Sequence, residues 1–279
     1  MYYTHLPARG LISLTGDDTI PFLQGLITND ARKLEQGQPL YAALLSPQGK
    51  YLHDFFLIPQ DGRIILDGEK HRLADLKQRL SLYKLRSKVA IEILPEGNGV
   101  VVCWGGGAQA ENNQIFVDPR IISLGFRMVG DIAENMAWCE AQGFERAVGA
   151  SYDKHRILHG IPDSSRDMTP DKSLMLEFNM DVLNAVDFSK GCYVGQEVTA
   201  RTKYRAQIKK TLCVVEAQKG ALPDAGATLI AAEKDIGHML SSVGDTGLAL
   251  MRIEALEQHE TFTMECGTVI KTREVYARG

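Results

Sequence analysis

The chain has 279 residues, of which 44% are hydrophobic and 24% are charged, and its formal net charge is −4. This is the composition of a globular protein with room for two or three modules. The slightly acidic balance gives no reason to expect a nucleic-acid partner, and the absence of a run of about 18 apolar residues argues against a membrane span.

The start of the chain bears on its compartment. The first sixteen residues, MYYTHLPARGLISLTG, contain neither a long apolar segment nor an Arg- and Ser-rich amphipathic leader. We therefore expect a cytoplasmic protein.

Two helices and five strands are predicted up to about residue 97. An aspartate, Asp17 or Asp18, can cap a helix that carries Phe22 and Leu23 and stops near Asn29. A second helix, residues 73–83, has leucines at intervals of three and four. Strands are expected at residues 10–15, 40–46, 51–58, 63–66 and 89–93, with a hairpin turn at Asp61-Gly62.

The pattern then repeats. Residues 99–104, 115–117 and 126–129 read as strands, and residues 131–141 and 145–158 as helices. Strands interrupted by helices, with antiparallel hairpins between them, predict an α+β fold of ferredoxin-like units, at about residues 1–97 and 98–204. A long irregular connection, residues 160–188, follows the last helix, and such connections are where sites are usually built.

After Tyr204 the chain changes to short strands, with turn signals about every ten residues. This spacing predicts an antiparallel β-barrel over residues 205–279. The expected strands are residues 208–215, 227–230, 236–243, 248–251, 261–264 and 269–272.

The segment FSKGCYVGQEVTARTKYR, residues 188–205, holds the densest chemistry. Lys190, Cys192, Gln196 and Glu197 fall within eight residues, and glycines flank the Cys-Tyr-Val run. Six basic residues between 190 and 210 face a single acid, Glu197. Nearby positive charge favours a thiolate over a thiol, so Cys192 is the best candidate for a reactive sulfur. The alternative is a small, buried, inert cysteine between two turn glycines, beside a solvated basic strand.

The other cysteines lack such surroundings. All five, Cys103, Cys139, Cys192, Cys213 and Cys266, are dispersed without a CxxC pair. An odd, scattered set argues against a disulfide framework and against a local zinc site. His155 and His159 have the spacing of two ligands on one helix face. Gly160 follows at once and no third ligand is suitably spaced, so we expect no metal site and two exposed histidines at a helix end.

The motif KGCYVGQE, with the following TAR, resembles the signature of YgfZ-type folate-binding proteins and, more closely, that of their mitochondrial relative in late iron-sulfur cluster assembly. Both groups belong to the superfamily of the glycine-cleavage T-protein, a tetrahydrofolate-dependent aminomethyltransferase. The resemblance covers nearly the whole chain and implies a T-protein-like fold with a C-terminal barrel.

The resemblance also implies a folate site. FLQGLITND is similar to the family's first helix and its polar turn, which makes Asn29 a candidate. GKYLHDFFL resembles a T-protein strand and puts Asp54 on an aspartate that would accept hydrogen bonds from a reduced pterin. Taken alone, Asp54 also reads as a surface residue of an alternating strand. The implied cofactor is tetrahydrofolate or a derivative.

Departures from the T-protein pattern matter too. His53 replaces an acidic residue, and in RILHG Leu158 stands where T-proteins have a pterin-anchoring glutamate. LEFNMD echoes the LESNLA motif of the mitochondrial factor, which adds Glu177 and Asn179 to the candidate ligands.

We therefore expect a folate-binding accessory factor for the assembly or repair of iron-sulfur clusters in other proteins. Cys192 would carry the chemistry, Lys190 would tune it, and Gln196 and Glu197 would fix the loop. The expected partners are folate and iron-sulfur assembly or client proteins, with a cluster held transiently. A tetrahydrofolate-dependent one-carbon transferase is the alternative, and a thiol enzyme that uses Cys192 as its nucleophile is a third reading.

Overall fold

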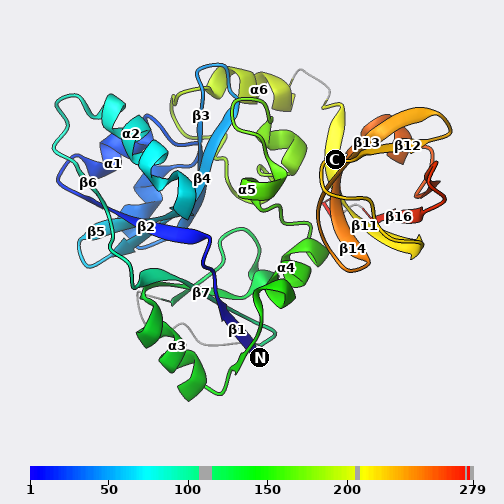
Figure 1. The fold of residues 1–279 in the computed structure, drawn as a ribbon. Coiled ribbons are helices and arrows are strands. Elements are labelled where there is room, and N and C mark those ends of the chain that lie inside the picture. Colours follow the sequence, from blue (N-terminus) through cyan, green and yellow to red (C-terminus); the bar gives the residue numbers. More distant parts are fainter. Residues whose placement is uncertain (107–114, 205–207, 274, 277–279) are drawn as a thin grey trace. The chain divides into compact units, whose positions relative to one another are not determined.

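The computed structural model describes residues 1–106, 115–204, 208–273 and 275–276. The chain forms two compact units, each built from two segments (Figure 1). The first unit contains residues 1–149 and 183–196, and the second contains residues 150–182 and 197–279. Residues 150–182 and 197–204, which the sequence analysis assigns to the N-terminal region, thus group with the barrel.

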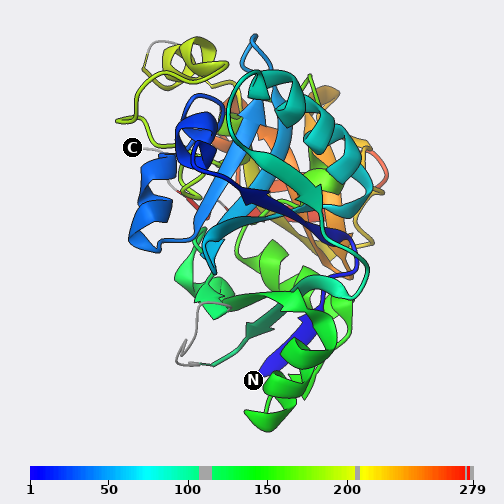
Figure 2. The same cartoon turned by 90° about the vertical axis from the view of Figure 1, so that its left-hand side faces the viewer.

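One sheet of the first unit is antiparallel, with strand order β3-β4-β5-β2-β6. Its strands are β2 (Arg9–Thr15), β3 (Leu40–Leu45), β4 (Tyr51–Gln60), β5 (Arg63–Glu69) and β6 (Ala90–Ile93). The helices beside it are α1 (Thr19–Gln24), η1 (Ala31–Gln36), η2 (Lys70–Arg72) and α2 (Leu73–Lys84). Figure 2 shows the blue and cyan helices in front of this sheet.

The sequence explains the order of these elements. Asp61 and Gly62 both have positive φ, 48° and 75°, as a two-residue hairpin turn between β4 and β5 requires. Alternate residues of β4 then face opposite sides of the sheet. Phe55 and Leu57 join the core beneath α1 and α2, together with Leu23 and Leu76. Asp54 and Phe56 consequently lie on the other face.

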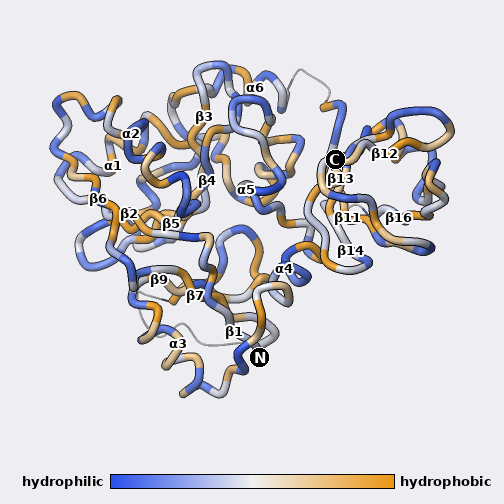
Figure 3. The backbone as a smooth tube through the Cα atoms, viewed as in Figure 1, coloured by the Kyte–Doolittle hydropathy of each residue, from blue (hydrophilic) through white to orange (hydrophobic). Residues whose placement is uncertain are grey.

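The second sheet of this unit has strand order β10-β1-β7-β9-β8. Its elements are β1 (Tyr2–His5), β7 (Asn98–Trp104), β8 (Ile115–Val117), η3 (Ile122–Leu124), β9 (Phe126–Asp131), α3 (Ile132–Ala141) and β10 (Glu145–Arg146). β1 pairs antiparallel with β7 and parallel with β10. The first strand of the chain therefore completes the sheet made by residues 98–146. In Figure 3 orange stretches along the strands of this unit mark its hydrophobic interior.

The barrel has strand order β12-β13-β14-β11-β16-β15. A bridge between Ala231 and Met264 joins its two edges and nearly closes it. Its strands are β11 (Lys210–Lys219), β12 (Thr228–Ala231), β13 (Lys234–Val243), β14 (Thr246–Arg252), β15 (Thr261–Thr263) and β16 (Val269–Arg273). The remaining helices are α4 (Gly149–Leu158), α5 (Ser164–Asp167), η4 (Met175–Phe178), α6 (Gln196–Tyr204) and α7 (Ile253–Leu256).

Most predicted elements are present, and three differ. α1 ends at Gln24, five residues before Asn29, and the N–H groups of Leu26 and Ile27 in the turn that follows both donate to the carbonyl of Leu23. The helix expected from residue 145 begins at Gly149, since residues 145–146 pair with β1. Residues 196–204, which the alternative interpretation of an inert Cys192 would put in a solvated basic strand, form helix α6. Every helix in the described ranges is too short or too polar to cross a membrane.

Candidate functional site

The cysteine loop, residues 187–196, is fastened to the turn between α1 and η1 at two backbone positions. The N–H of Asp187 donates to the carbonyl of Thr28 at 3.0 Å, and the N–H of Val194 donates to the carbonyl of Gly25 at 3.3 Å. Val194 also packs against the core beneath the first sheet. The loop therefore has a defined backbone path on both sides of Cys192.

Lys190 is the main side-chain anchor of this loop. It is only 4% exposed, and its Nζ donates to the carbonyls of Gln24, Ile27 and Asn29 at 2.8, 2.6 and 2.8 Å. Gln24 is the last residue of α1, where carbonyls lack partners within the helix, and Ile27 and Asn29 lie in the turn that follows. Burial lowers the pKa of Lys190 to about 8, against the opposing effect of Asp30 and Asp187. The ammonium that these three acceptors need is thus still the main form at neutral pH.

Cys192 itself is exposed, whereas Cys103, Cys139 and Cys213 are buried. The residue that follows it, Tyr193, is buried, and its ring centroid lies 5.0 Å from Nζ of Lys190. The sulfur therefore sits at the surface beside an anchored tyrosine and an anchored lysine. The alternative of a buried, inert Cys192 does not describe this structure.

The two loop glycines differ in what they do. Gly195 has a φ of +83°, and a Cβ there would lie 2.6 Å from the carbonyl oxygen of Ser46. A larger residue at position 195 would push the loop away from the β3–β4 turn. Gly191 has no neighbour within 4 Å of such a Cβ and is absent from the positive-φ residues. The shape of the loop thus depends on Gly195.

The electrostatic surroundings of the loop are less basic than the sequence predicts. Lys33 bonds Asp187 at 2.8 Å, and the hydrogen bonds from Lys33 and Ser189 lower the pKa of Asp187 although burial opposes this. Arg32 bonds Asp30 at 2.6 Å and lowers its pKa to about 2. Lys190, the first residue of the predicted basic rim, uses its ammonium group on three backbone carbonyls. Arg205, another member of the rim, lies outside the described residues. Arg201 and Lys203 belong to α6 in the second unit, where Lys203 bonds Asp181 at 3.0 Å.

Gln196 and Glu197, the other two loop candidates, begin α6. The N–H of Gln196 donates to the carbonyl of Tyr193 at 3.3 Å, so Gln196 closes the turn that follows the cysteine. Glu197 is exposed in the first helical turn, where a carboxylate suits the helix dipole.

Tyr41, which the sequence did not single out, completes a chain of hydrogen bonds from Lys190 through Asn29 to Asp54. Nδ2 of Asn29, whose carbonyl binds Lys190, donates to the carbonyl of Tyr41 at 2.9 Å and to that of Asn184 at 2.8 Å. The Tyr41 hydroxyl donates to Oδ2 of Asp54 at 2.8 Å. A small pocket of about 200 Å³ lies along this path, lined by Asn29, Lys33, Gln38, Pro39, Leu40, Tyr41, Pro119, Asn184 and Val186.

Asp54 is buried rather than exposed on its strand, at 8% exposure. Besides Tyr41, the hydroxyl of Tyr51 donates to its Oδ1 at 3.0 Å. Asn29 is also saturated, because its Oδ1 accepts from the N–H of Asp30 at 2.8 Å and from Nζ of Lys33 at 3.3 Å. A pterin that bonded to Asp54 would have to compete with a tyrosine hydroxyl.

A cluster of arginines covers the same face of the first sheet. The carboxylate of Asp67, which is fully buried, accepts from Arg9 and from Arg127 at 2.6 Å each. Arg127 lies 4.0 Å from the ring centroid of Phe56, and Arg120 lies 4.9 Å from it. The strand pattern alone could have placed Asp54 and Phe56 on one face. It could not have brought arginines from β9 and its neighbouring loop onto that face.

The remaining predicted ligands lie in the second unit. Asn179 is buried, and its Nδ2 donates to the carbonyl of Leu212 at 3.0 Å while its Oδ1 accepts from the Thr211 hydroxyl at 3.3 Å. It ties η4 to strand β11. Glu177, on η4, is half-buried. Their role as folate ligands stays a prediction.

The histidines are mostly structural. His53 faces α2, and its Nε2 lies 2.8 Å from Oδ2 of Asp75. Burial, with Arg72 as the next cause, lowers the pKa of His53 to about 4. His155 and His159 are half-buried rather than exposed, with ring centroids 4.6 Å apart. Within the described ranges no group of three or more His, Cys, Asp and Glu residues is placed to hold a metal ion.

The fold places the chain in a structural class. It matches the crystal structure of glycine cleavage system aminomethyltransferase T from Bartonella henselae with a TM-score of 0.75, over 98% of this chain and 85% of that one. The sequence identity is 16%, so the likeness concerns the fold alone. The predicted α+β, T-protein-like fold with its C-terminal barrel is confirmed. Residues 209–277 match the CAF17 C-terminal beta-barrel domain.

Sequence relatives narrow the class to a family. The chain is 37% identical to the iron-sulfur cluster assembly factor IBA57 homolog, mitochondrial, of Mycosarcoma maydis over 74% of this chain, and it spans 55% of that protein. It is 30% and 32% identical to the proteins of the same name in Coccidioides immitis and Pyricularia oryzae, over 91% of this chain and 72% of each relative. The chain belongs to the family of IBA57 homologues.

One prediction is wrong. These relatives are named as mitochondrial proteins, which points to the mitochondrion rather than the cytoplasm. The prediction rested on the composition of the first sixteen residues. Residues 2–5 and 9–15 are strands β1 and β2, so this composition reflects folding and says nothing of the compartment.

Proposed function

We propose that this protein is an assembly factor for iron-sulfur clusters and that Cys192 is its working residue. The observation that carries the proposal is the exposed Cys192 thiol on a loop that Lys190 fastens to three carbonyls of the α1–η1 turn. The names of the family relatives support the iron-sulfur part of the proposal.

The chemistry follows from one exposed sulfur. A thiol that binds iron gives up its proton and donates a sulfur lone pair to the metal. A cluster generally takes four protein or small-thiol ligands, so one cysteine supplies part of a shell that another protein or a small thiol completes. This arrangement suits transient holding, because each departing ligand is replaced by one from the recipient. The cluster is therefore cargo, and its partners are iron-sulfur assembly or client proteins.

Folate is a separate part of the proposal. Its support is the resemblance of GKYLHDFFL to the T-protein strand, with Asp54 as the acceptor. Asp54 already accepts from the hydroxyls of Tyr41 and Tyr51, and the amide of Asn29 donates to two backbone carbonyls, so a pterin N–H would join or replace these protein donors at Asp54. Exchange of the Tyr51 hydroxyl for a pterin N–H would trade one charge-assisted bond for another, at about 1.5 to 3 kcal/mol each.

A folate-dependent one-carbon transferase is the second candidate, favoured by the same resemblance of Asp54. Leu158, which is 37% exposed, offers no carboxylate where a T-protein has one. Incubation of the purified chain with tetrahydrofolate and an aminomethyl or methyl donor decides between the two. We expect no folate product, and steady turnover would favour the transferase.

The test of the assembly role uses cells that lack this protein. We expect the full chain to restore the activity of an enzyme that carries a [4Fe–4S] cluster, with no change in the amount of that enzyme. An enzyme of the same cells without a cluster is the control. Equal recovery of both enzymes, or of neither, would contradict the assembly role.

A further inference from the structure

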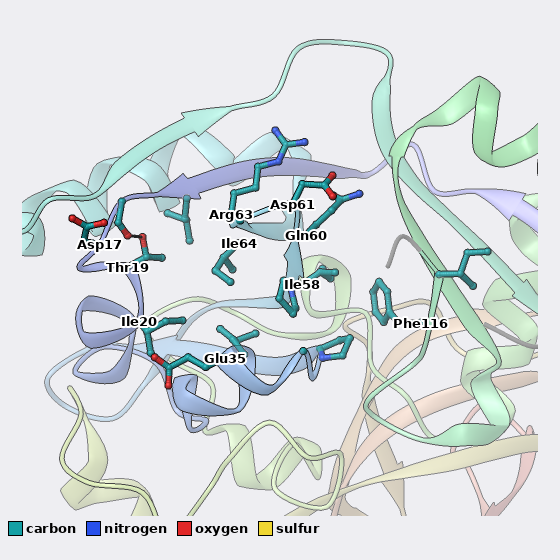
Figure 4. A pocket seen from close by; sticks show the side chains of 18 residues that line it. Asp17, Thr19, Ile20, Glu35, Ile58, Gln60, Asp61, Arg63, Ile64 and Phe116 are labelled. Atoms are coloured by element: carbon teal, nitrogen blue, oxygen red, sulfur yellow. Dashed lines mark hydrogen bonds between the residues drawn. The ribbon is translucent and has the colours of Figure 1, made fainter. Parts of the chain in front are cut away.

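A larger pocket of the first unit lies apart from the cysteine loop and from Asp54. It measures about 640 Å³ and is bounded by the end of the β4–β5 hairpin, the start of α1, and η1 (Figure 4). Its lining, within the described residues, contains none of the predicted site residues. Pockets that bind small organic ligands have volumes of about 300 to 1,000 Å³.

The interior of this pocket is apolar. Ile58, Ile64, Leu34 and Phe116 are each buried and line it. Figure 4 shows Phe116 at one end, with Ile58 and Ile64 between it and the start of α1. An aromatic or aliphatic body of a ligand would remove these side chains from the water that otherwise fills the pocket.

Gln60 is the exception among the interior residues. It is 7% exposed and lines the pocket, and in the described part of the chain its side-chain amide makes no hydrogen bond. The buried amides of Asn29 and Asn179, by contrast, both have hydrogen-bond partners. A primary amide has two donors and one acceptor, and the amide of Gln60 faces an open pocket where water can bond to it. A ligand amide edge could replace that water, because no protein group competes for the Gln60 side chain among the described residues.

The other polar residues of the pocket are charged. Asp17 and Glu35 are exposed on the α1 and η1 side, while Asp61 and Arg63 lie with Gln60 on the hairpin (Figure 4). Three acids face one base, so the mouth attracts a cation over an anion. Nε of Arg63, the cross-strand partner of Gln60, is buried and has no partner among the described residues. The hairpin wall thus offers donors to a ligand oxygen, and the opposite wall offers carboxylates.

We propose that this pocket binds a small organic cation that combines a flat apolar body with an amide or lactam edge. The body lies against Ile58, Ile64 and Phe116, the amide edge pairs with Gln60, and the positive charge faces Asp17 and Glu35. The site is independent of the proposed iron-sulfur role, because it shares no residue with the cysteine loop.

The test is an NMR titration of the isotopically labelled full chain with two probes. 4-(Aminomethyl)benzamide carries a ring, an ammonium and an amide, and benzylamine lacks only the amide. We expect both probes to shift the methyl resonances of Ile58 and Ile64, with the amide probe binding roughly fivefold more tightly, the effect of about one net hydrogen bond. A negatively charged analogue, 4-carbamoylbenzoate, should bind more weakly than either.

Three variants distinguish specific binding through Gln60 from nonspecific binding of the probes. Gln60→Met keeps the side-chain length and should remove the advantage of the amide probe while leaving benzylamine binding unchanged. Gln36→Met, on the exposed side of η1, is the matched control and should preserve the advantage. Ile20→Trp, at the α1 wall, should block both probes. Equal binding of the two probes to the parent chain, an unchanged ratio in Gln60→Met, or no shifts at Ile58 and Ile64 would overturn the proposal.

Discussion

Two neighbouring residues of the cysteine loop have opposite surroundings. Lys190 is buried and uses its ammonium on three backbone carbonyls, whereas Cys192 is exposed. From the sequence both looked like parts of one reactive cluster. Residue types and spacing predicted an exposed, important cysteine, but they could not tell that the lysine holds the end of α1, because its acceptors are 161 to 166 positions away.

Lys190→Met tests this anchoring role. The methionine keeps most of the side-chain volume but leaves three carbonyls without their donor, so we expect a loss of roughly 2 to 4 kcal/mol in the free energy of unfolding. Urea unfolding followed by circular dichroism measures it. Lys88→Met, at an exposed lysine of the same unit, should change stability by less than about 0.5 kcal/mol. Equal stability of the two variants would show that the three hydrogen bonds do not hold the loop.

Two substitutions of Asp54 test its role, because its carboxylate accepts hydrogen bonds from the hydroxyls of two tyrosines. Asp54→Ala removes the acceptor of Tyr41 and Tyr51 and should cost about 2 to 4 kcal/mol of stability. Asp54→Asn keeps an acceptor oxygen and should cost less than half of that. Isothermal titration with tetrahydrofolate should show weaker binding by both variants if Asp54 contacts the pterin. Parent-like affinity in the stable Asp54→Asn variant would rule out that contact.

In strand β4, the alternation of apolar and polar residues predicts which face of the sheet each side chain lies on, but not whether that face is buried. The pattern predicted the strand, and its period of two places His53 beneath α2 and Asp54 on the opposite face. A half-buried strand would leave one of these faces in water. Both are buried here, because β9 and its neighbouring loop bring Arg127 and Arg120 onto the second face. Contacts of that kind join distant segments and leave no local sequence signal.

The buried His53 makes stability depend on pH on the acid side. Its pKa falls from 6.5 to about 4 on folding, so below pH 6.5 the unfolded chain takes up a proton that the folded chain does not. Stability should therefore fall as the pH is lowered from 6.5 to 4, by at most roughly 3 kcal/mol from this residue. His53→Gln should show a shallower fall in urea unfolding across this range. The exposed His71→Gln should behave like the parent, and matching slopes in all three proteins would refute the assignment.

For the whole molecule, the fold class and the barrel could be predicted because strand spacing and motif resemblance are local properties. The grouping of residues 150–182 with the barrel could not. It depends on Arg156, whose guanidinium donates to Asp153 at 2.8 Å, the carbonyl of Ile161 at 3.0 Å, Asp167 at 3.4 Å and Ser241 at 2.8 Å. Asp167 also accepts from the N–H of Ser241 at 2.8 Å. These bonds fasten α4 and α5 to barrel strand β13.

Arg156→Met should therefore loosen the second unit. Removal of one partner of a buried ion pair leaves an uncompensated charge on Asp167 and costs about 3 to 5 kcal/mol. Hydrogen-exchange mass spectrometry of the full chain should show faster exchange in α5 and β13. Arg166→Met removes a 46% exposed partner of Asp153 and should have a small effect, about 1 kcal/mol or less. Unchanged protection of β13 in Arg156→Met would contradict the role of this network.

We propose that the Cys192 sulfur binds iron during the assembly of iron-sulfur clusters. A rescue measurement with a matched pair of variants tests this role most directly. Cys192→Ser changes an exposed sulfur to oxygen and should fold and melt like the parent chain. Cys266→Ser makes the same change at the other exposed cysteine of the described residues. In cells that lack the protein, we expect Cys266→Ser to restore the activity of a [4Fe–4S] enzyme and Cys192→Ser, present in equal amount, to fail. Full restoration by Cys192→Ser would contradict the claim.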